Sequence, residues 1–145
     1  MMNEGPSHPK QLKPQITPHK TYQDDFSSGR GNALQAVVAS IFGLQLSRVP
    51  NFIETSEGYE AAIKRFCKNG GIDCTKITLP GSDDSILERY DGNLCILRGK
   101  SPRGAFGHVV VARRVGTGFE MMHDPHPEGT FLDVEETFGW CMFFA

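Results

Sequence analysis

The sequence lacks a long hydrophobic run, an excess of positive charge and the cysteine spacing of a metal site. None of its apolar runs reaches the roughly 18 residues that a membrane-spanning helix needs. The net charge of −2 offers no electrostatic footprint for nucleic acid or for an anionic membrane. We therefore expect neither nucleic acid nor membrane as a partner, and the partner has to be inferred from a site.

Cysteine is scarce, and its placement argues against both disulfides and zinc. The first 20 residues are polar and proline-bearing and do not resemble an export signal, so we expect a cytoplasmic chain with reduced thiols. The pair in "CKNGGIDC" has neither zinc spacing nor a second pair. In "HDPH", His123 and Asp124 would face opposite ways along a strand. We expect no metal and no other cofactor.

A length of 145 residues fits one domain with a core of its own. Residues 1–20 hold four of the nine prolines and show no apolar periodicity, which predicts a flexible or extended N-terminal arm. The folded domain should then comprise residues 21–145.

Two helices are expected before a series of strands. The first begins at Asn32, a good N-cap after "SSGRG", and ends at Gly43; the second is capped by Ser56 and runs to about Lys68. A strand in "CTKITL" and a short helix in "DDSILERY" follow, and then strands in "NLCILRG", "GHVVVARRV", "FEMMHDP" and "WCMFFA". Helices followed by short strands predict an α+β fold, with a central helix packed on an antiparallel sheet.

The predicted hairpin of residues 108–124 brings an imidazole and a carboxylate together. A three-residue loop at 116–118 would pair Val115 with Phe119, and that register sets residue 110 opposite 124. His108 and Asp124 then lie on one face in diagonal contact, whereas His123 points to the other face. A carboxylate in this place can fix the tautomer of His108 and leave its other ring nitrogen to a nucleophile.

The Gly-rich loop before the first helix leads to a position where a nucleophile would be activated, but cysteine is missing there. A thiol at the first helical position would feel the positive end of the helix dipole, which favours the thiolate. Ala33 occupies this position. Upstream, Gln23 could donate a side-chain amide hydrogen to an oxyanion, beside a backbone N–H of the helix start.

These residues carry a resemblance to a known family. Gln23 followed by "GNALQAVVASIFGL", "VPNF", "GHVVVAR" and "HDPHPEG" resembles the papain-like cysteine hydrolases, in the branch of the double-glycine leader (bacteriocin-processing) peptidases and their small bacterial and phage relatives. The resemblance covers about residues 22–145. It implies a papain-like fold, a nucleophilic cysteine where Ala33 stands, His108 as base, Asp124 as its orienter and Gln23 as oxyanion residue. Gln23 lies farther upstream than in the leader peptidases.

The implied function is a metal-free thiol hydrolase that cleaves a peptide, isopeptide or glutamine amide bond in a peptide or protein substrate, inactivated by alanine at position 33. Three alternatives remain open at this point. The alanine is either a deliberate Cys-to-Ala substitution, which we favour, or a natural feature of a pseudo-peptidase that only binds. Deamidase or transglutaminase chemistry would use the same triad.

Other candidates for the chemistry are weaker. Cys95 lies in the apolar run "LCIL", and Cys67 lies near the end of its helix, where the dipole disfavours a thiolate. The loop "RGKSPRG" precedes His108, and we expect Lys100 and Arg103 to be available there to a substrate.

Overall fold

The computed structural model describes residues 11–27, 31–79 and 84–145. Its first helix, α1 (Ala33–Phe42), begins after Asn32 and ends at Gly43, as predicted. Gly43 adopts a left-handed conformation with a φ of 68°, which glycine tolerates without a steric penalty. Eight of the ten residues of α1 are buried, so the helix forms the centre of the protein.

The second helix, α2 (Tyr59–Asn69), begins later than expected. Its N-cap is Gly58, with a φ of 91°, and the predicted cap at Ser56 is wrong. Two single 3-10 turns, Leu46–Arg48 and Phe52–Glu54, connect the two helices. The apolar residues of α2 pack against the second turn and share one core with those of α1, and Ile63 is completely buried.

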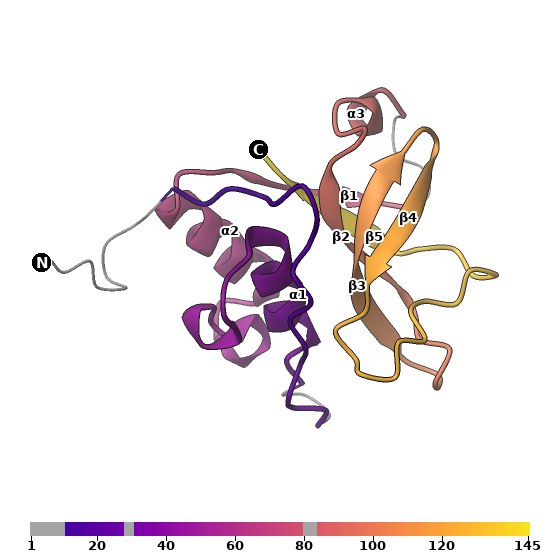
Figure 1. Cartoon of the computed structure of the whole chain (residues 1–145), viewed down its shortest axis with the longest axis horizontal. Helices are drawn as coiled ribbons and strands as arrows, with labels where there is room; N and C mark the ends of the chain where they lie inside the picture. The colour runs from indigo at the N-terminus through magenta and orange to yellow at the C-terminus, as the bar shows by residue number, and fades with distance from the viewer. Residues whose placement is uncertain (1–10, 28–30, 80–83) are drawn as a thin grey trace, which may run out of the picture.

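Five antiparallel strands form one sheet in the order β1-β5-β2-β3-β4. The strands are β1 (Cys74–Thr78), β2 (Leu94–Lys100), β3 (Gly107–Val115), β4 (Gly118–His123) and β5 (Trp140–Phe144), with the short helix α3 (Asp84–Glu88) between β1 and β2. Each predicted strand is present. The protein is therefore an α+β protein with an antiparallel sheet, and α1 and α2 lie together on one side of it (Figure 1).

The turn between β3 and β4 differs from the prediction. Val115 pairs with Gly118, so the loop has two residues and the pairing next to it is shifted by one position. A bulge between Val111 and Ala112 then inserts one residue in β4, and Val111 pairs with His123. This last pairing is the one that the predicted register implies, because the bulge compensates for the shorter loop. The expectation was wrong at the turn and right at the end of the hairpin that leads to Asp124.

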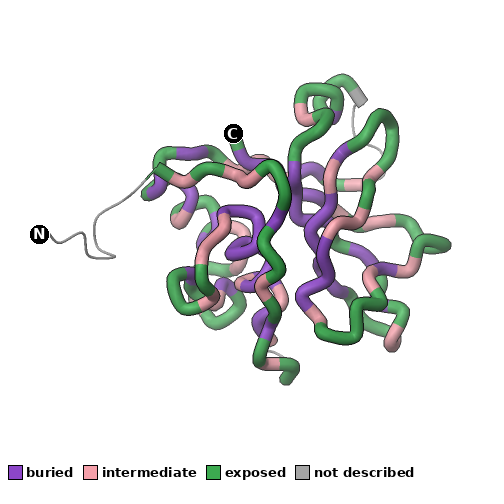
Figure 2. The backbone as a smooth tube through the Cα atoms, in the orientation of Figure 1, coloured by how far each residue is buried: buried purple, intermediate pink, exposed green. Residues whose placement is uncertain are grey.

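Each face of the sheet has its own apolar core. On one face, Ile96, Val109 and Val111 pack with residues of α1 and α2. On the other, Leu97 and Val110 pack with Leu87 of α3 and Leu132 of the loop after β4, because side chains alternate along a strand. Figure 2 shows the buried chain concentrated where the helices meet the sheet.

The described part of the N-terminal arm is extended and packed against the helices. The backbone N–H of Leu12 donates to Gly70 O at 2.7 Å, and those of Gln15 and His19 donate to carbonyls near the end of α1. Residues 11–20 thus lie along α1 and α2, and the prediction for residues 1–10 falls outside the described residues.

Among the described residues, no single helix is both long and apolar enough to cross a membrane. One bent pair, α1 with Leu46–Glu54 at 96°, meets the length and composition criteria together. In this structure α1 is a buried core helix.

Candidate active site

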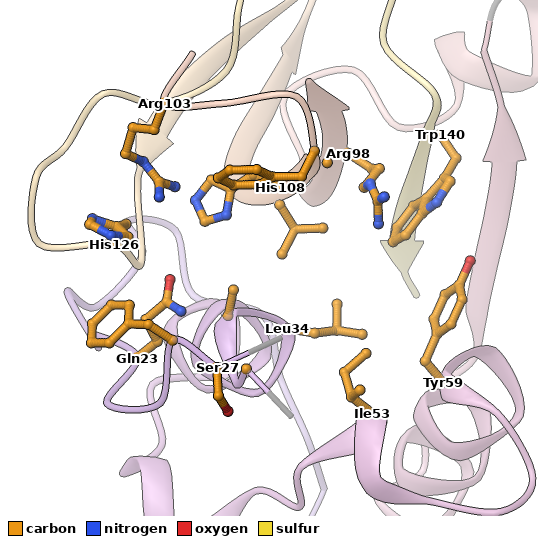
Figure 3. A pocket seen from close by; sticks show the side chains of 16 residues that line it. Gln23, Ser27, Leu34, Ile53, Tyr59, Arg98, Arg103, His108, His126 and Trp140 are labelled. Atoms are coloured by element: carbon orange, nitrogen blue, oxygen red, sulfur yellow. The ribbon is translucent and has the colours of Figure 1, made fainter. Parts of the chain in front are cut away.

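A pocket of about 610 Å³ lies between the start of α1 and the start of β3 (Figure 3). Ala33 and His108 both line it, as does Gln23. The remaining lining residues are Phe26, Ser27, Gly31, Leu34, Ile53, Tyr59, Arg98, Arg103, Phe106, Gly107, Val109, His126 and Trp140. Three of the four residues predicted for the site therefore share one pocket, and the fourth, Asp124, contacts one of them.

His108 is held by Asp124, and the predicted contact between them is confirmed. Nε2 of His108 lies 2.7 Å from Oδ1 of Asp124, and both side chains are buried. A carboxylate oxygen accepts, so Nε2 carries the proton in this hydrogen bond. Nδ1 is then the ring nitrogen left for a reacting group in the pocket.

Asp124 is itself fixed by the loop that follows it. Oδ1 also accepts from the backbone N–H of His126 at 2.9 Å, and Oδ2 accepts from that of Phe131 at 2.8 Å. Burial raises the pKa of Asp124, but the hydrogen bonds from His108 and from these two N–H groups outweigh it, so the pKa lies below the usual value. The carboxylate is therefore ionised at neutral pH and can stabilise a charged imidazole.

His123 points away from the dyad and fastens the segment before α1. Its Nε2 lies 2.8 Å from the carbonyl oxygen of Thr21, and its ring packs edge-on against Tyr22. The backbone N–H of Gln23 donates to Pro125 O at 3.0 Å. These contacts join residues 21–23 to the chain around Asp124 and bring Gln23 to the pocket.

The side chain of Gln23 does not yet present the donor that an oxyanion needs. It is buried, and its Nε2 donates to Asp25 O at 3.2 Å. Its Oε1 is buried without a hydrogen-bond partner among the described residues. A role for Gln23 as oxyanion donor requires the second hydrogen of Nε2 or a rotation of the amide.

The Asn32 side chain binds the loop that precedes α1 and does not cap the helix. The Asn32 side chain makes no cap hydrogen bond to the helix; Oδ1 accepts from the backbone N–H groups of Asp24 and Asp25 at 3.0 and 2.9 Å. The expected N-cap function is thus replaced by closure of the loop onto the helix. The first intrahelical hydrogen bond of α1 runs from Ala36 to Asn32 O, so the N–H groups of residues 33–35 have no acceptor within the helix.

None of the four native cysteines lines the pocket. All four are free thiols: Cys67, Cys74, Cys95 and Cys141. Burial raises the pKa of Cys95 well above normal and that of Cys141 to about 12. A hydrogen bond with Cys67, followed by burial, raises the pKa of Cys74. Cys74, Cys95 and Cys141 are therefore not suited to act as nucleophiles near neutral pH.

Several pocket residues were not foreseen from the sequence. Arg98, Tyr59 and Trp140 come from three different elements, and Ile53 and Phe26 from turns and loops. The stacking of Tyr59 on Trp140, with ring centroids 5.6 Å apart, carries no local sequence signal. Of the two cations expected near His108, Arg103 lines the pocket, whereas Lys100 does not and pairs with Asp133 at 3.8 Å.

His126 is the one unforeseen residue with a sequence signal, because it is a second histidine two residues after Asp124. Its ring lies 6.4 Å from that of His108, centroid to centroid. Burial, and then the charge of Arg103, lower the pKa of His126, so the ring is neutral at pH 7.

Comparisons with protein-family models, with curated proteins and with solved structures found no match to this chain. Among the described residues, no group of three or more His, Cys, Asp or Glu side chains is placed to hold a metal ion. The functional argument therefore rests on the pocket itself.

Proposed function

We propose that the pocket is the active site of a papain-like thiol hydrolase acting on peptide or related amide bonds, with alanine in place of the nucleophile. One observation carries the proposal: His108, which is hydrogen-bonded to Asp124 at 2.7 Å, lines the same pocket as Ala33, the first residue of a buried helix. A base, its orienter and a helix N-terminus are what a reactive thiol needs around it.

With cysteine at position 33, the reaction would proceed in two halves. The thiol transfers its proton to Nδ1 of His108, and the thiolate attacks the carbonyl carbon of the substrate. The N–H groups at the start of α1, which have no acceptor within the helix, stabilise the resulting oxyanion, aided by Gln23 if its amide donates. The carbon–nitrogen bond then breaks as His108 protonates the leaving amine. Water, deprotonated by His108, attacks the thioester and releases the acid and the thiol.

Asp124 has a defined part in this scheme. By accepting a hydrogen bond from Nε2–H of His108, the carboxylate keeps Nδ1 unprotonated in the resting state and stabilises the imidazolium that forms afterwards. Its lowered pKa supports this role, since the carboxylate stays ionised across the working range of a histidine base.

The alternative is a binding module that uses the same pocket without cleavage. It is favoured by the alanine itself, and by the placement of all four native thiols outside the pocket. The chain with Ala33 would then hold a peptide, and the imidazole would serve as a hydrogen-bonding group.

The test is to restore the sulfur. We expect Ala33→Cys to react with iodoacetamide at least about tenfold faster than any native thiol, because only this thiol combines a helix start with an imidazole. The measurement is the alkylation rate of each cysteine by mass spectrometry between pH 6 and about 8. His108→Ala in the same background should remove the advantage near neutral pH. If the thiol at position 33 reacts no faster than Cys95, the hydrolase proposal is wrong and the binding module remains.

A further inference from the structure

The pocket carries a charge that the proposed chemistry does not use. Arg98 and Arg103 both line it, and no acidic residue does so among the described residues. Figure 3 shows the two arginines on opposite sides of His108. The reaction scheme needs one base and one oxyanion site, so two flanking guanidinium groups call for another explanation.

Neither arginine is neutralised within the described part of the chain. The ion pairs there involve other cations, and no carboxylate pairs with Arg98 or Arg103. Arg103 donates from Nε to Thr130 Oγ1 at 3.2 Å, and its guanidinium lies 5.8 Å from the ring centroid of Phe106. These contacts orient the guanidinium and leave its charge uncompensated. The protein as a whole has a net charge of −2, so this positive pocket is a local feature.

Gly107, the first residue of β3, leaves room for the guanidinium of Arg98. A Cβ atom on Gly107 would overlap the guanidinium of Arg98, which therefore lies flat against the backbone beside His108. Glycine at position 107 is thus needed for this close approach.

The rim of the pocket is apolar and exposed. Phe26 is 55% exposed, Phe106 52% and Ile53 41%, and all three line the pocket. Exposed apolar side chains gathered around one hollow mark a binding surface. At one side of the pocket, the half-buried Tyr59 and Trp140 stack and offer an aromatic wall to an apolar group (Figure 3).

We propose that the occupant of this pocket is an acidic peptide segment, with an apolar side chain against Trp140 and carboxylates on both sides of His108 that bind Arg98 and Arg103. This inference rests on the proposed function, because it names the substrate class of the same site. Guanidinium groups pair with carboxylates through parallel hydrogen bonds, which makes arginine suited to select such a segment.

The test measures binding by the chain as it stands, since alanine at position 33 prevents turnover. The probes are two rhodamine-labelled peptides with blocked ends, Glu-Glu-Leu-Gly-Glu-Glu and its neutral match Gln-Gln-Leu-Gly-Gln-Gln, followed by fluorescence anisotropy. We expect the acidic peptide to bind at least about tenfold more tightly at about 50 mM salt, and this preference to shrink at about 500 mM.

Variants assign the preference to the two arginines. Arg98→Gln and Arg103→Gln should each weaken binding of the acidic peptide about threefold to fivefold and leave the neutral peptide unaffected. Arg98→Lys should retain part of the preference. Gly107→Ala should displace the Arg98 guanidinium and cost about twofold, although every charge remains. The matched control is Arg89→Gln, beyond α3 and outside the pocket, which should have no effect.

Several results would overturn the inference: equal affinity for both peptides, no binding of either at about millimolar concentration, an equal loss with Arg89→Gln, or displacement of the peptide by a thymidine oligonucleotide of the same charge. Thermal unfolding of each variant shows that the fold is kept. The two proposals fail separately. Acidic preference without turnover in Ala33→Cys would refute the hydrolase alone, and turnover without acidic preference would refute the acidic substrate alone.

Discussion

Two buried histidines lie next to Asp124, His108 by a hydrogen bond and His123 as its neighbour in the sequence, and they have different partners. Their exposed fractions are 7% and 4%, so burial does not distinguish them. His108 pairs with a carboxylate and faces the pocket, whereas His123 bonds to a backbone carbonyl and packs against Tyr22. The partner of an imidazole, rather than its burial, indicates whether it is placed for chemistry or for holding the chain together.

The largest expected effect separates these two roles directly. In the Ala33→Cys background, His108→Ala should lower kcat for peptide hydrolysis about 10⁴-fold, because no base remains for the thiol. His123→Ala should lower kcat far less, once rates are expressed per folded molecule. The measurement is steady-state hydrolysis with the folded fraction determined by circular dichroism. Equal losses of kcat in the two variants would contradict the assignment of different roles to His108 and His123.

The next effect concerns the aspartate that holds His108. Asp124→Ala should reduce kcat in the Ala33→Cys background about 10³- to 10⁴-fold, because nothing then holds the proton of His108 on Nε2 or orients the ring. It should also lower the free energy of unfolding by about 2 to 4 kcal/mol, because the N–H groups of His126 and Phe131 lose their acceptor.

Asp124→Asn is the matched control. The single amide oxygen of Asn is best placed at the Oδ1 position, where it accepts from both His108 and the N–H of His126. The proton of His108 then stays on Nε2, and only the N–H of Phe131 loses its acceptor. We expect it to retain more turnover than Asp124→Ala. Urea unfolding and hydrolysis rates measured on both variants decide this, and an Asn variant as slow as the Ala variant would contradict the tautomer argument.

A smaller effect is expected at His123. His123→Ala should lower the free energy of unfolding by about 1 to 3 kcal/mol, through the lost hydrogen bond to Thr21 and the lost contact with Tyr22. Amide hydrogen exchange should show residues 21–23 opening more often. Unaltered exchange in this segment would mean that His123 does not fasten it.

The smallest expected effect is the pH dependence of stability. The pKa of Asp124 is lower in the folded protein than its usual 3.8, so its contribution is fully present above that value and is lost as the pH falls below it. The free energy of unfolding should therefore decline between about pH 5 and pH 2. Asp124→Asn should have a shallower decline, and an identical slope would show that Asp124 contributes nothing to it.

The fold was largely predictable because its signals are local. Every strand has an apolar β-prone run and the first helix has its stop at Gly43, so element types follow from short windows of sequence. The start of α2 was misjudged because Ser56 has the chemistry of a cap, while the chain turns at Gly58. The bulge in the β3–β4 hairpin has no clear sequence signal either, and the contact of His108 with Asp124 was predicted correctly although the turn was not.

The pocket was only partly predictable because its walls come from distant segments. Ala33, His108 and Asp124 follow from helix and strand geometry, whereas the meeting of Ile53, Tyr59 and Trp140 depends on tertiary packing. The orientation of the Gln23 amide depends on tertiary contacts, so the sequence could not show that its Oε1 has no hydrogen-bond partner in the described part of the chain.

The position of β5 links the pocket to the order of synthesis. β1 is an edge strand whose one neighbour in the sheet is β5, and β5 lies between β1 and β2. A ribosome therefore produces β1 long before its partner exists, and until then β1 and β2 each lack a neighbour and present an open edge. Trp140, which closes one wall of the pocket, lies in β5 itself. A nascent chain thus already contains α1 and His108 while its pocket is still open on this side, and the pocket is complete only when the last strand of the sheet has been made.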